Sequence, residues 1–199
     1  MVAGVETLAA LVAFSFVSSV TPGPNNVLLW ASGASFGFRA TVPHILGTAL
    51  GIGTMALVVA AGLGTLFTAA PQLELVMKIG ASAYLLYLAF QVAGANALER
   101  GSLVRPLGFL QAAAFQVVNP KAWVFALGAI TAFRPAGVPV VAGSLLVMAT
   151  MTAVLIPSAA LWAGGGGALG RLMSGERTRR AVSLTMGLLL VATVVTVWV

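Results

Sequence analysis

The chain has 199 residues, of which 60% are hydrophobic and only 7% are charged, and its mean hydropathy is +1.06. Soluble domains carry about 25% charged residues, so this composition predicts an all-α membrane protein with almost no soluble part. Cysteine is absent, which excludes disulfides, thiol redox chemistry and thiolate metal sites. The net charge of +6 does not indicate nucleic-acid binding, because the few basic residues lie between apolar segments and are better explained by membrane topology.

The first apolar segment, residues 8–34, contains a motif that breaks the pattern of a spanning helix: Thr21-Pro22-Gly23-Pro24-Asn25-Asn26. Proline has no backbone N–H, so in a continuous helix Pro22 would leave the carbonyl of Ser18 unpaired, and Pro24 that of Val20. Each proline also disfavours helical angles at the preceding residue. A helix broken at membrane depth is tolerated only where protein or a water-filled cavity surrounds it. The motif therefore predicts a broken first helix that forms part of a solute site.

A second break is predicted at Asn119-Pro120-Lys121, inside the apolar segment 109–133, where Pro120 frees the carbonyl of Gln116. Two interrupted helices in corresponding halves of a chain are typical of the binding site of a transporter. The offset between Pro22 and Pro120, 120 − 22 = 98, is close to half the chain.

The remaining apolar segments predict four more spans, at residues 42–67, 73–95, 138–162 and 181–199. The run Gly164–Gly167 is expected to be a flexible exit from the fifth span. The N-terminal segment is expected to remain as a span rather than to be cleaved as a signal peptide, because no basic residue precedes it and it carries Glu6.

The distribution of arginines predicts the orientation of the chain in the membrane. Loops after the first, third and fifth expected spans carry Arg39, Arg100, Arg105, Arg171, Arg177, Arg179 and Arg180, whereas the loops after the second and fourth carry only Arg134. The positive-inside rule then places the odd loops in the cytoplasm and both termini outside. With three spans in each half, the single domain 1–199 is predicted to comprise two inverted repeats, 1–97 and 108–199, joined by a cytoplasmic linker, 98–107.

Several side chains within the expected spans leave two interpretations open. His44 is either a satisfied residue near the membrane interface, which is favoured, or a proton carrier. Gly47 and Gly51 form a G-x-x-x-G pair, which favours close helix packing. Either Tyr84 or Tyr87 could face the cavity, because a tyrosine at mid-membrane needs a hydrogen-bond partner.

Glu74 and Lys78 have the i, i+4 spacing that supports a helix. A pair at the end of a helix, with the lysine extending toward the lipid headgroups, is favoured over an ion pair that gates transport.

These motifs resemble the signatures of the LysE/RhtB family of amino-acid exporters. The first motif, followed by Gly37-Phe38-Arg39, Gly47 and Gly51, is similar to the family's first signature, and Asn119-Pro120-Lys121-Ala122 is similar to its second. Lys78, Gly80 and Tyr84-Leu85 match as well. The doubled asparagine and Gly-Phe-Arg resemble the subgroup that exports cysteine and related small amino acids. Thr41 departs from the pattern, since many members have glycine there.

The resemblance implies export of amino acids across the bacterial inner membrane by secondary transport coupled to protons. An amino acid is a zwitterion, and the ends of half-helices offer it both kinds of partner: carbonyls of Ser18, Val20 and Gln116, and N–H groups of Asn25, Asn26 and Ala122. The expected substrate-binding residues are Thr21, Pro22, Gly23, Pro24, Asn25, Asn26, Asn119, Pro120 and Lys121.

Lys121 is the cation expected deepest in the membrane, either as a carboxylate partner and proton-coupled switch or as a structural cap on carbonyls. Lys121 and His44 are the candidates for proton coupling, because aspartate is absent and no glutamate lies in mid-span. Uncoupled exit also remains open. No metal or cofactor is expected, the expected partners are an amino acid and membrane lipid, and homodimerisation is left open.

Other classes of protein fit less well. A metal exporter would need clusters of carboxylate, histidine or cysteine ligands, and an enzyme would need a nucleophile with a base. The alternatives that remain are a structural membrane subunit and an exporter of another small polar solute.

Overall fold

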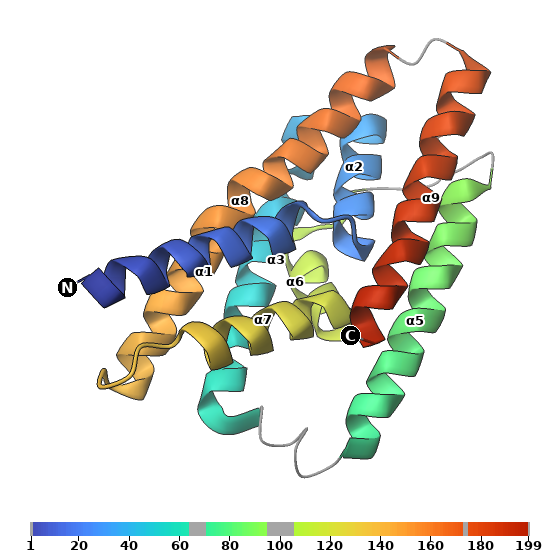
Figure 1. Cartoon of the computed structure of the whole chain (residues 1–199). Helices are drawn as coiled ribbons and strands as arrows, with labels where there is room; N and C mark the ends of the chain where they lie inside the picture. Colours follow the sequence, from blue (N-terminus) through green and yellow to red (C-terminus); the bar gives the residue numbers. More distant parts are fainter. Residues whose placement is uncertain (1, 64–70, 95–105, 173–174, 199) are drawn as a thin grey trace.

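The computed structural model describes residues 2–63, 71–94, 106–172 and 175–198, and the elements in these ranges are all helical (Figure 1). Their bounds in chain order are α1 (Val2–Val20), α2 (Pro24–Phe36), α3 (Phe38–Val58), the π-helical η1 (Val59–Leu63), α5 (Pro71–Ala93), α6 (Phe109–Val118), α7 (Pro120–Phe133), α8 (Val140–Leu172) and α9 (Glu176–Trp198). The predicted all-α class is confirmed. Most of the expected linker 98–107 lies outside the described residues.

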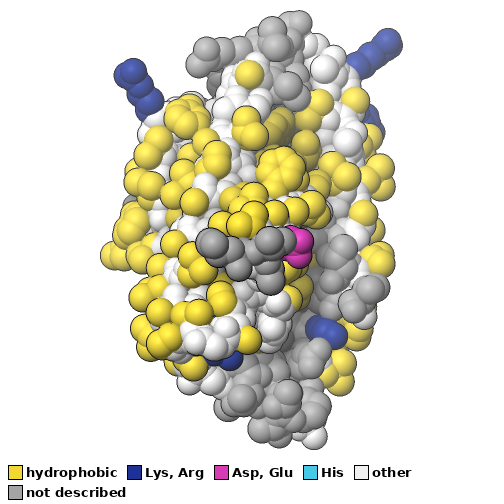
Figure 2. Space-filling model, turned by 60° about the vertical axis from the view of Figure 1, so that its left-hand side comes forward, with side chains coloured by type: hydrophobic (Ala, Val, Ile, Leu, Met, Phe, Trp, Pro, Cys, Tyr) yellow, Lys and Arg dark blue, Asp and Glu magenta, His cyan; other side chains and the backbone are white. Residues whose placement is uncertain are grey.

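Among the described residues, two helices, Phe38–Gly62 and Val140–Ala168, are long and apolar enough to cross a membrane. Two bent pairs, α1 with α2 and α6 with α7, also qualify if each pair is one span, which gives up to four. Figure 2 shows hydrophobic side chains spread over the face of the molecule that it presents, as expected of a surface in contact with lipid. The prediction of six spans as an inverted repeat remains a prediction.

Both predicted helix breaks are present. The axes of α1 and α2 differ by 59°, and those of α6 and α7 by 78°. Gly23 and Asn119, which precede the prolines that begin α2 and α7, have extended backbones with φ/ψ of −172°/173° and −90°/107°. Proline disfavours helical angles at the preceding residue and fits the first position of a helix, so each break follows from local chain chemistry.

The glycine run Gly164–Gly167 lies inside α8, which continues to Leu172, so the prediction of a flexible exit is wrong. The second half of the run, Gly166 and Gly167, serves helix packing instead. A Cβ on Gly166 would collide with the carbonyl of Trp30 in α2, and a Cβ on Gly33 would collide with the carbonyl of Ala163 in α8. The backbones of α2 and α8 therefore touch, as small residues permit between membrane helices.

Gly47 and Gly51 of α3 make a similar close contact with α6, which confirms their predicted packing role. A Cβ on Gly47 would collide with the carbonyl of Phe109, and one on Gly51 would lie 2.6 Å from the carbonyl oxygen of Ala113. This contact brings α6, and with it the second break, against the middle of the bundle.

The main core lies among α1, α2, α3, α7 and α8, with Leu29, Ile45, Phe125 and Met151 among its buried side chains. In Figure 1, α5 and α9 lie side by side at one edge, where Leu85 and Leu190 form a smaller cluster with Val27 of α2. The α2–α3 junction, the C-terminal end of α5 and the α8–α9 junction lie at one end of the molecule. Ala122 and Phe125 at the start of α7 belong to the main core, and Val27 at the start of α2 belongs to the smaller cluster.

The α2–α8 contact predicts opposite effects for neighbouring glycines. Gly166→Ala should lower the thermal stability of the detergent-solubilised protein, because overpacking a tight contact costs about 1–3 kcal/mol. Gly164→Ala is the control, since a Cβ there meets nothing within 4 Å, and it should leave stability unchanged or raise it by up to about 1 kcal/mol through helix propensity. Equal melting temperatures for the two variants would show that the glycine contact does not hold α2 and α8 together.

Candidate functional site

A pocket lies where the two helix breaks meet. Its lining includes Gly23, Asn25 and Asn26 from the first break and Asn119 and Lys121 from the second. The apolar part of the wall is formed by Ile52, Phe125, Leu155 and Ala159. The cavity volume is about 30 Å³, which has room for roughly two water molecules. In this conformation the pocket is therefore narrow, and a larger solute requires it to widen.

Lys121 connects the two breaks. Its Nζ donates hydrogen bonds to the carbonyl oxygens of Thr21 and Pro22, the latter at 3.3 Å. Glycine at position 23 makes room for this side chain, because a Cβ there would lie 2.7 Å from Lys121 Cδ. The ammonium of α7 is thus held by backbone dipoles at the end of α1, and the structural capping interpretation of Lys121 has a geometric basis.

Side chains pair with three carbonyls at the first break. Asn26 Nδ2 donates to the carbonyls of Ser19 and Thr21 at 2.7 and 2.8 Å, and Thr193 Oγ1 of α9 donates to the carbonyl of Pro22 at 2.9 Å. These three were not predicted, because they depend on where the chain leaves the helical path, at Thr21. The carbonyls of Ser18 and Val20 stay predicted acceptors, and Ser18 lines the pocket.

At the second break, two groups expected to bind solute are already paired. The carbonyl of Gln116 accepts from the N–H of Asn119 at 3.1 Å, and the N–H of Ala122 donates to the carbonyl of Asn119 at 3.0 Å. Short turns across a single extended residue close this break. The N–H of Ala122 is therefore not available to a solute as predicted, whereas the carbonyl of Gln116 keeps a second lone pair and its role stays a prediction. At the first break, Val27 makes the first bond of α2, to Gly23, so the N–H groups of Asn25 and Asn26 point out of the helix N-terminus.

Asn25 is the centre of a buried polar network. Its Oδ1 lies 3.0 Å from Gln116 Nε2, 3.1 Å from Thr48 Oγ1 and 3.2 Å from His44 Nε2. Gln116 Oε1 in turn accepts from Asn119 Nδ2 at 3.0 Å. The network therefore links α2, α3, α6 and the second break through side chains that lie up to 91 residues apart.

His44 is fully buried in α3, and its Nε2 lies 3.2 Å from Asn25 Oδ1. The helix begins at Phe38 rather than at residue 42, which places His44 in its second turn. The position of His44 near the membrane interface stays a prediction. His44 Nδ1 has no hydrogen-bond partner among the described residues. His44 thus touches the site indirectly, through Asn25.

The chain matches the family model of the LysE type translocator over residues 16–197. It belongs to the LysE family of translocators. The resemblance predicted from the two proline motifs is confirmed, and with it the localisation as a multi-pass protein of the inner membrane.

Curated relatives of this LysE-family chain include efflux proteins. It is 29% identical over 126 residues to the cysteine/O-acetylserine efflux protein of Escherichia coli (strain K12) and 28% identical to that of Salmonella typhimurium (strain LT2). Each match covers 63% of this chain and 65% of the relative. No solved structure matches the chain.

The structure brings together most of the predicted site residues of this LysE-family protein. Gly23, Asn25, Asn26, Asn119 and Lys121 line the pocket. Thr21 and Pro22 hold Lys121 through their carbonyls. Pro24 and Pro120 are buried at the starts of α2 and α7.

Four polar side chains that line the pocket were not predicted from the sequence: Ser18, Ser19, Thr48 and Gln116. Thr48 and Gln116 both line the pocket and bond to Asn25. Gln116 could have been found, because it is a polar side chain in a largely apolar segment three residues before Asn119, yet only its carbonyl was considered. Thr48, one turn after His44, gave a weaker signal, because threonine is common in membrane helices.

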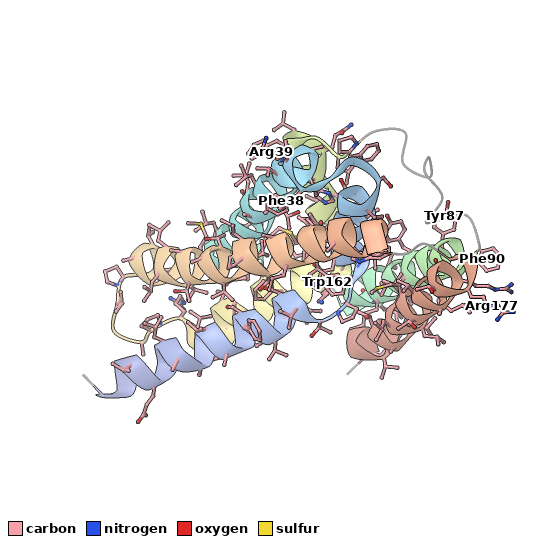
Figure 3. All side chains as sticks on the ribbon, turned by 90° about the horizontal axis from the view of Figure 1, so that it is seen from above. Phe38, Arg39, Tyr87, Phe90, Trp162 and Arg177 are labelled. Carbon is pink, nitrogen blue, oxygen red and sulfur yellow. The ribbon has the colours of Figure 1, made fainter. Side chains whose placement is uncertain are left out.

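Neither tyrosine of α5 lines the pocket. Tyr87 is 56% exposed at the outer edge of the molecule, near Phe90 (Figure 3), and the Tyr84 ring packs 6.1 Å from that of Phe115. The side chain of Glu74 lies outside the described part of the chain, as do Glu99, Arg100 and Arg105. The described residues contain no cluster of three or more His, Asp or Glu that could hold a metal ion.

Proposed function

We propose that the protein exports small neutral amino acids or their derivatives from the cytoplasm across the inner membrane by secondary transport, and that the pocket between the two helix breaks is the substrate site. The observation that carries this proposal is the position of Lys121, an ammonium that spans from one broken helix to the carbonyls of the other. The relatives are named cysteine/O-acetylserine efflux proteins, which supports a small amino acid as the substrate.

The pocket offers partners for both charges of a zwitterion. Lys121 and the N-terminus of α2, with the N–H groups of Asn25 and Asn26, favour a carboxylate. Amide oxygens and the carbonyls at the end of α1 favour an ammonium. In the empty site the carbonyls of Thr21 and Pro22 hold Lys121, and a substrate carboxylate would replace them as its partner. Each carbonyl would keep its other donor, Asn26 Nδ2 or Thr193 Oγ1, and would regain one lone pair for the substrate ammonium.

Substrate binding requires movement, because the cavity of about 30 Å³ is smaller than any amino acid. Release of Lys121 from the carbonyls of Thr21 and Pro22 is the simplest way to widen it. Because this contact joins the two broken helices, its opening would also loosen one half of the protein from the other. We propose that this step links substrate binding to alternating access.

We propose that the chain forms six spans arranged as two inverted three-helix repeats, 1–97 and 108–199. The packing supports this plan: the broken pair of the first half packs through α1 and α2 on α8, and the broken pair of the second half packs through α6 and α7 on α3. α3 and α8 are the spans expected to correspond in the two halves, and they also pack on each other. A pseudo-two-fold axis produces this arrangement, in which the broken pair of each half packs on the corresponding span of the other half.

Proton coupling, if the family resemblance extends to it, would involve Lys121 or His44. Lys121 exchanges partners during the proposed cycle, and His44 contacts Asn25 next to the pocket. The rival functions are a structural subunit, which has no use for a polar pocket between two breaks, and export of another small polar solute, which substrate competition distinguishes.

The role of Lys121 predicts the effect of removing its charge. Lys121→Met keeps the length and the apolar stem, so it should preserve insertion while lowering efflux of labelled L-cysteine from cells at least about tenfold, the effect of losing one charged hydrogen bond. Lys121→Arg should keep only part of the wild-type efflux, because a planar guanidinium does not reproduce a compact ammonium. Efflux is measured from mildly acidic to mildly alkaline pH at matched protein levels. Equal rates and pH profiles for wild type and Lys121→Met would remove Lys121 from the mechanism.

The six-span plan predicts which connections are accessible from outside. The chain has no cysteine, so single cysteines can be placed without background. In intact cells a membrane-impermeant maleimide should label Gly137→Cys, between α7 and α8, and should not label Gly175→Cys, between α8 and α9, until the cells are opened. Labelling of both, or of Gly175→Cys alone, would refute the proposed orientation.

A further inference from the structure

We propose that the side-chain oxygen Oδ1 of Asn119 binds the ammonium group of the substrate, and that Gln116 is the positioning residue that makes this oxygen available. The site would thereby recognise α-amino acids through a free ammonium. This inference rests on the proposed export function and deepens it, since it assigns the two charges of the substrate to two neighbouring side chains.

The orientation of the Gln116 amide is fixed by the backbone. Gln116 Nε2 lies 3.0 Å from the carbonyl oxygen of Ala112. A carbonyl oxygen only accepts hydrogen bonds, so the end of the amide that faces it must be the amino group. The opposite end, Oε1, must then accept. The donor or acceptor character of a buried amide is usually ambiguous, but here Ala112 decides it.

The same logic passes from Gln116 to Asn119. The Asn119 side chain lies 3.0 Å from Gln116 Oε1, so the group there must be its amino group, Nδ2. Asn119 therefore has its oxygen at the other end. This Oδ1 has no hydrogen-bond partner among the described residues, although Asn119 is only 3% exposed.

A buried amide oxygen without a donor is unfavourable, and native structures leave few of them. Asn119 also lines the pocket. A substrate ammonium would supply the missing donor with a charged hydrogen bond. The oxygen has less than 1 Å² of exposed surface, so the ammonium reaches it only as the pocket widens, in the step that releases Lys121.

The other bonds of Gln116 hold it in place. Nε2 also donates to Asn25 Oδ1 at 3.0 Å, and Asn25 Oδ1 lies 3.2 Å from His44 Nε2, which must then be the protonated nitrogen. Gln116 is thus held by α2 and by its own helix, and its oxygen cannot turn toward Ala112. The network orients Asn119 without itself touching the substrate ammonium.

The positions of Asn119 and Lys121 suit an α-amino acid. Both line the same pocket at the start of α7, and in an α-amino acid a single carbon separates ammonium from carboxylate, so one molecule in the pocket can present a charge to each. The carboxylate would bind Lys121 and the ammonium Asn119, which leaves the apolar residues Phe125 and Leu155 of the pocket wall for the substrate side chain. A small, weakly polar side chain fits such a wall.

The test uses the purified full chain in proteoliposomes and counterflow of labelled L-cysteine kept reduced. Two competitors each lack one of the two charges of L-cysteine: L-cysteinamide lacks the carboxylate, and 3-mercaptolactate carries a hydroxyl in place of the ammonium. Wild type should prefer L-cysteine over both. Asn119→Leu should weaken the binding of L-cysteine about 10- to 100-fold and that of 3-mercaptolactate much less, because its hydroxyl can donate only a neutral hydrogen bond to Oδ1. Lys121→Met should instead lose the discrimination against L-cysteinamide.

Gln116→Leu should reduce the discrimination between L-cysteine and 3-mercaptolactate as Asn119→Leu does, and the double variant should lose no more than either single one, because both act on the same bond. Gln111→Leu is the matched control: Gln111 lies in the same helix, is exposed, and its side chain accepts from the N–H of Gly108, away from the pocket. It should leave the discrimination unchanged. Asn119→Asp loses the donor to Gln116 Oε1 but keeps an acceptor oxygen that binds an ammonium more strongly, so it should retain or increase the discrimination even if Asn119→Leu folds poorly.

Two outcomes separate this inference from the function on which it rests. Transport of L-cysteine with the same discrimination in wild type, Asn119→Leu and Asn119→Asp would overturn the role of Asn119 and leave the export function standing. Absence of counterflow of L-cysteine and of other small α-amino acids by the wild type would overturn both.

Discussion

The structure depends on the need to pair backbone groups that proline leaves open inside a membrane. Pro22, Pro24 and Pro120 interrupt helices where lipid offers no hydrogen bonds, so each released group must find a partner within the protein. The partners are polar side chains from the other elements: Asn26, Lys121 and Thr193 at the first break. The same requirement that holds the breaks together also gathers polar groups into one pocket, which is where a solute can bind.

Features that local chemistry determines could be predicted from the sequence. Proline disfavours helical angles at the residue before it, and both breaks were predicted at the correct residues, as was the packing role of Gly47 and Gly51. Pro43 and Pro157 lie inside α3 and α8 without a break, so proline breaks a helix here only where the motif repeats it or adds glycine or asparagine. The family membership could also be predicted, because its signatures contain these same residues.

Features that depend on the path of the chain in space could not be predicted. The carbonyls used at the first break are set by where the chain leaves the helix, and the bond between Asn25 and Gln116 joins residues 91 positions apart. The run Gly164–Gly167 looked flexible because glycine lowers helix propensity, but the approach of Trp30 to Gly166 reverses its meaning. Composition alone does not distinguish a flexible glycine from one that a neighbouring backbone requires.

The central claim is that the discontinuity of the helices, rather than their packing, makes the transport site. The most direct measurement compares efflux of labelled L-cysteine by wild type and by the double variant Pro22→Ala, Pro24→Ala, with protein level and thermal stability determined in parallel. Closing the helix restores backbone bonds, so the account predicts a variant at least as stable as wild type that has lost most of its efflux. A variant that exports L-cysteine at the wild-type rate would contradict the account and reduce the break to a kink that serves packing.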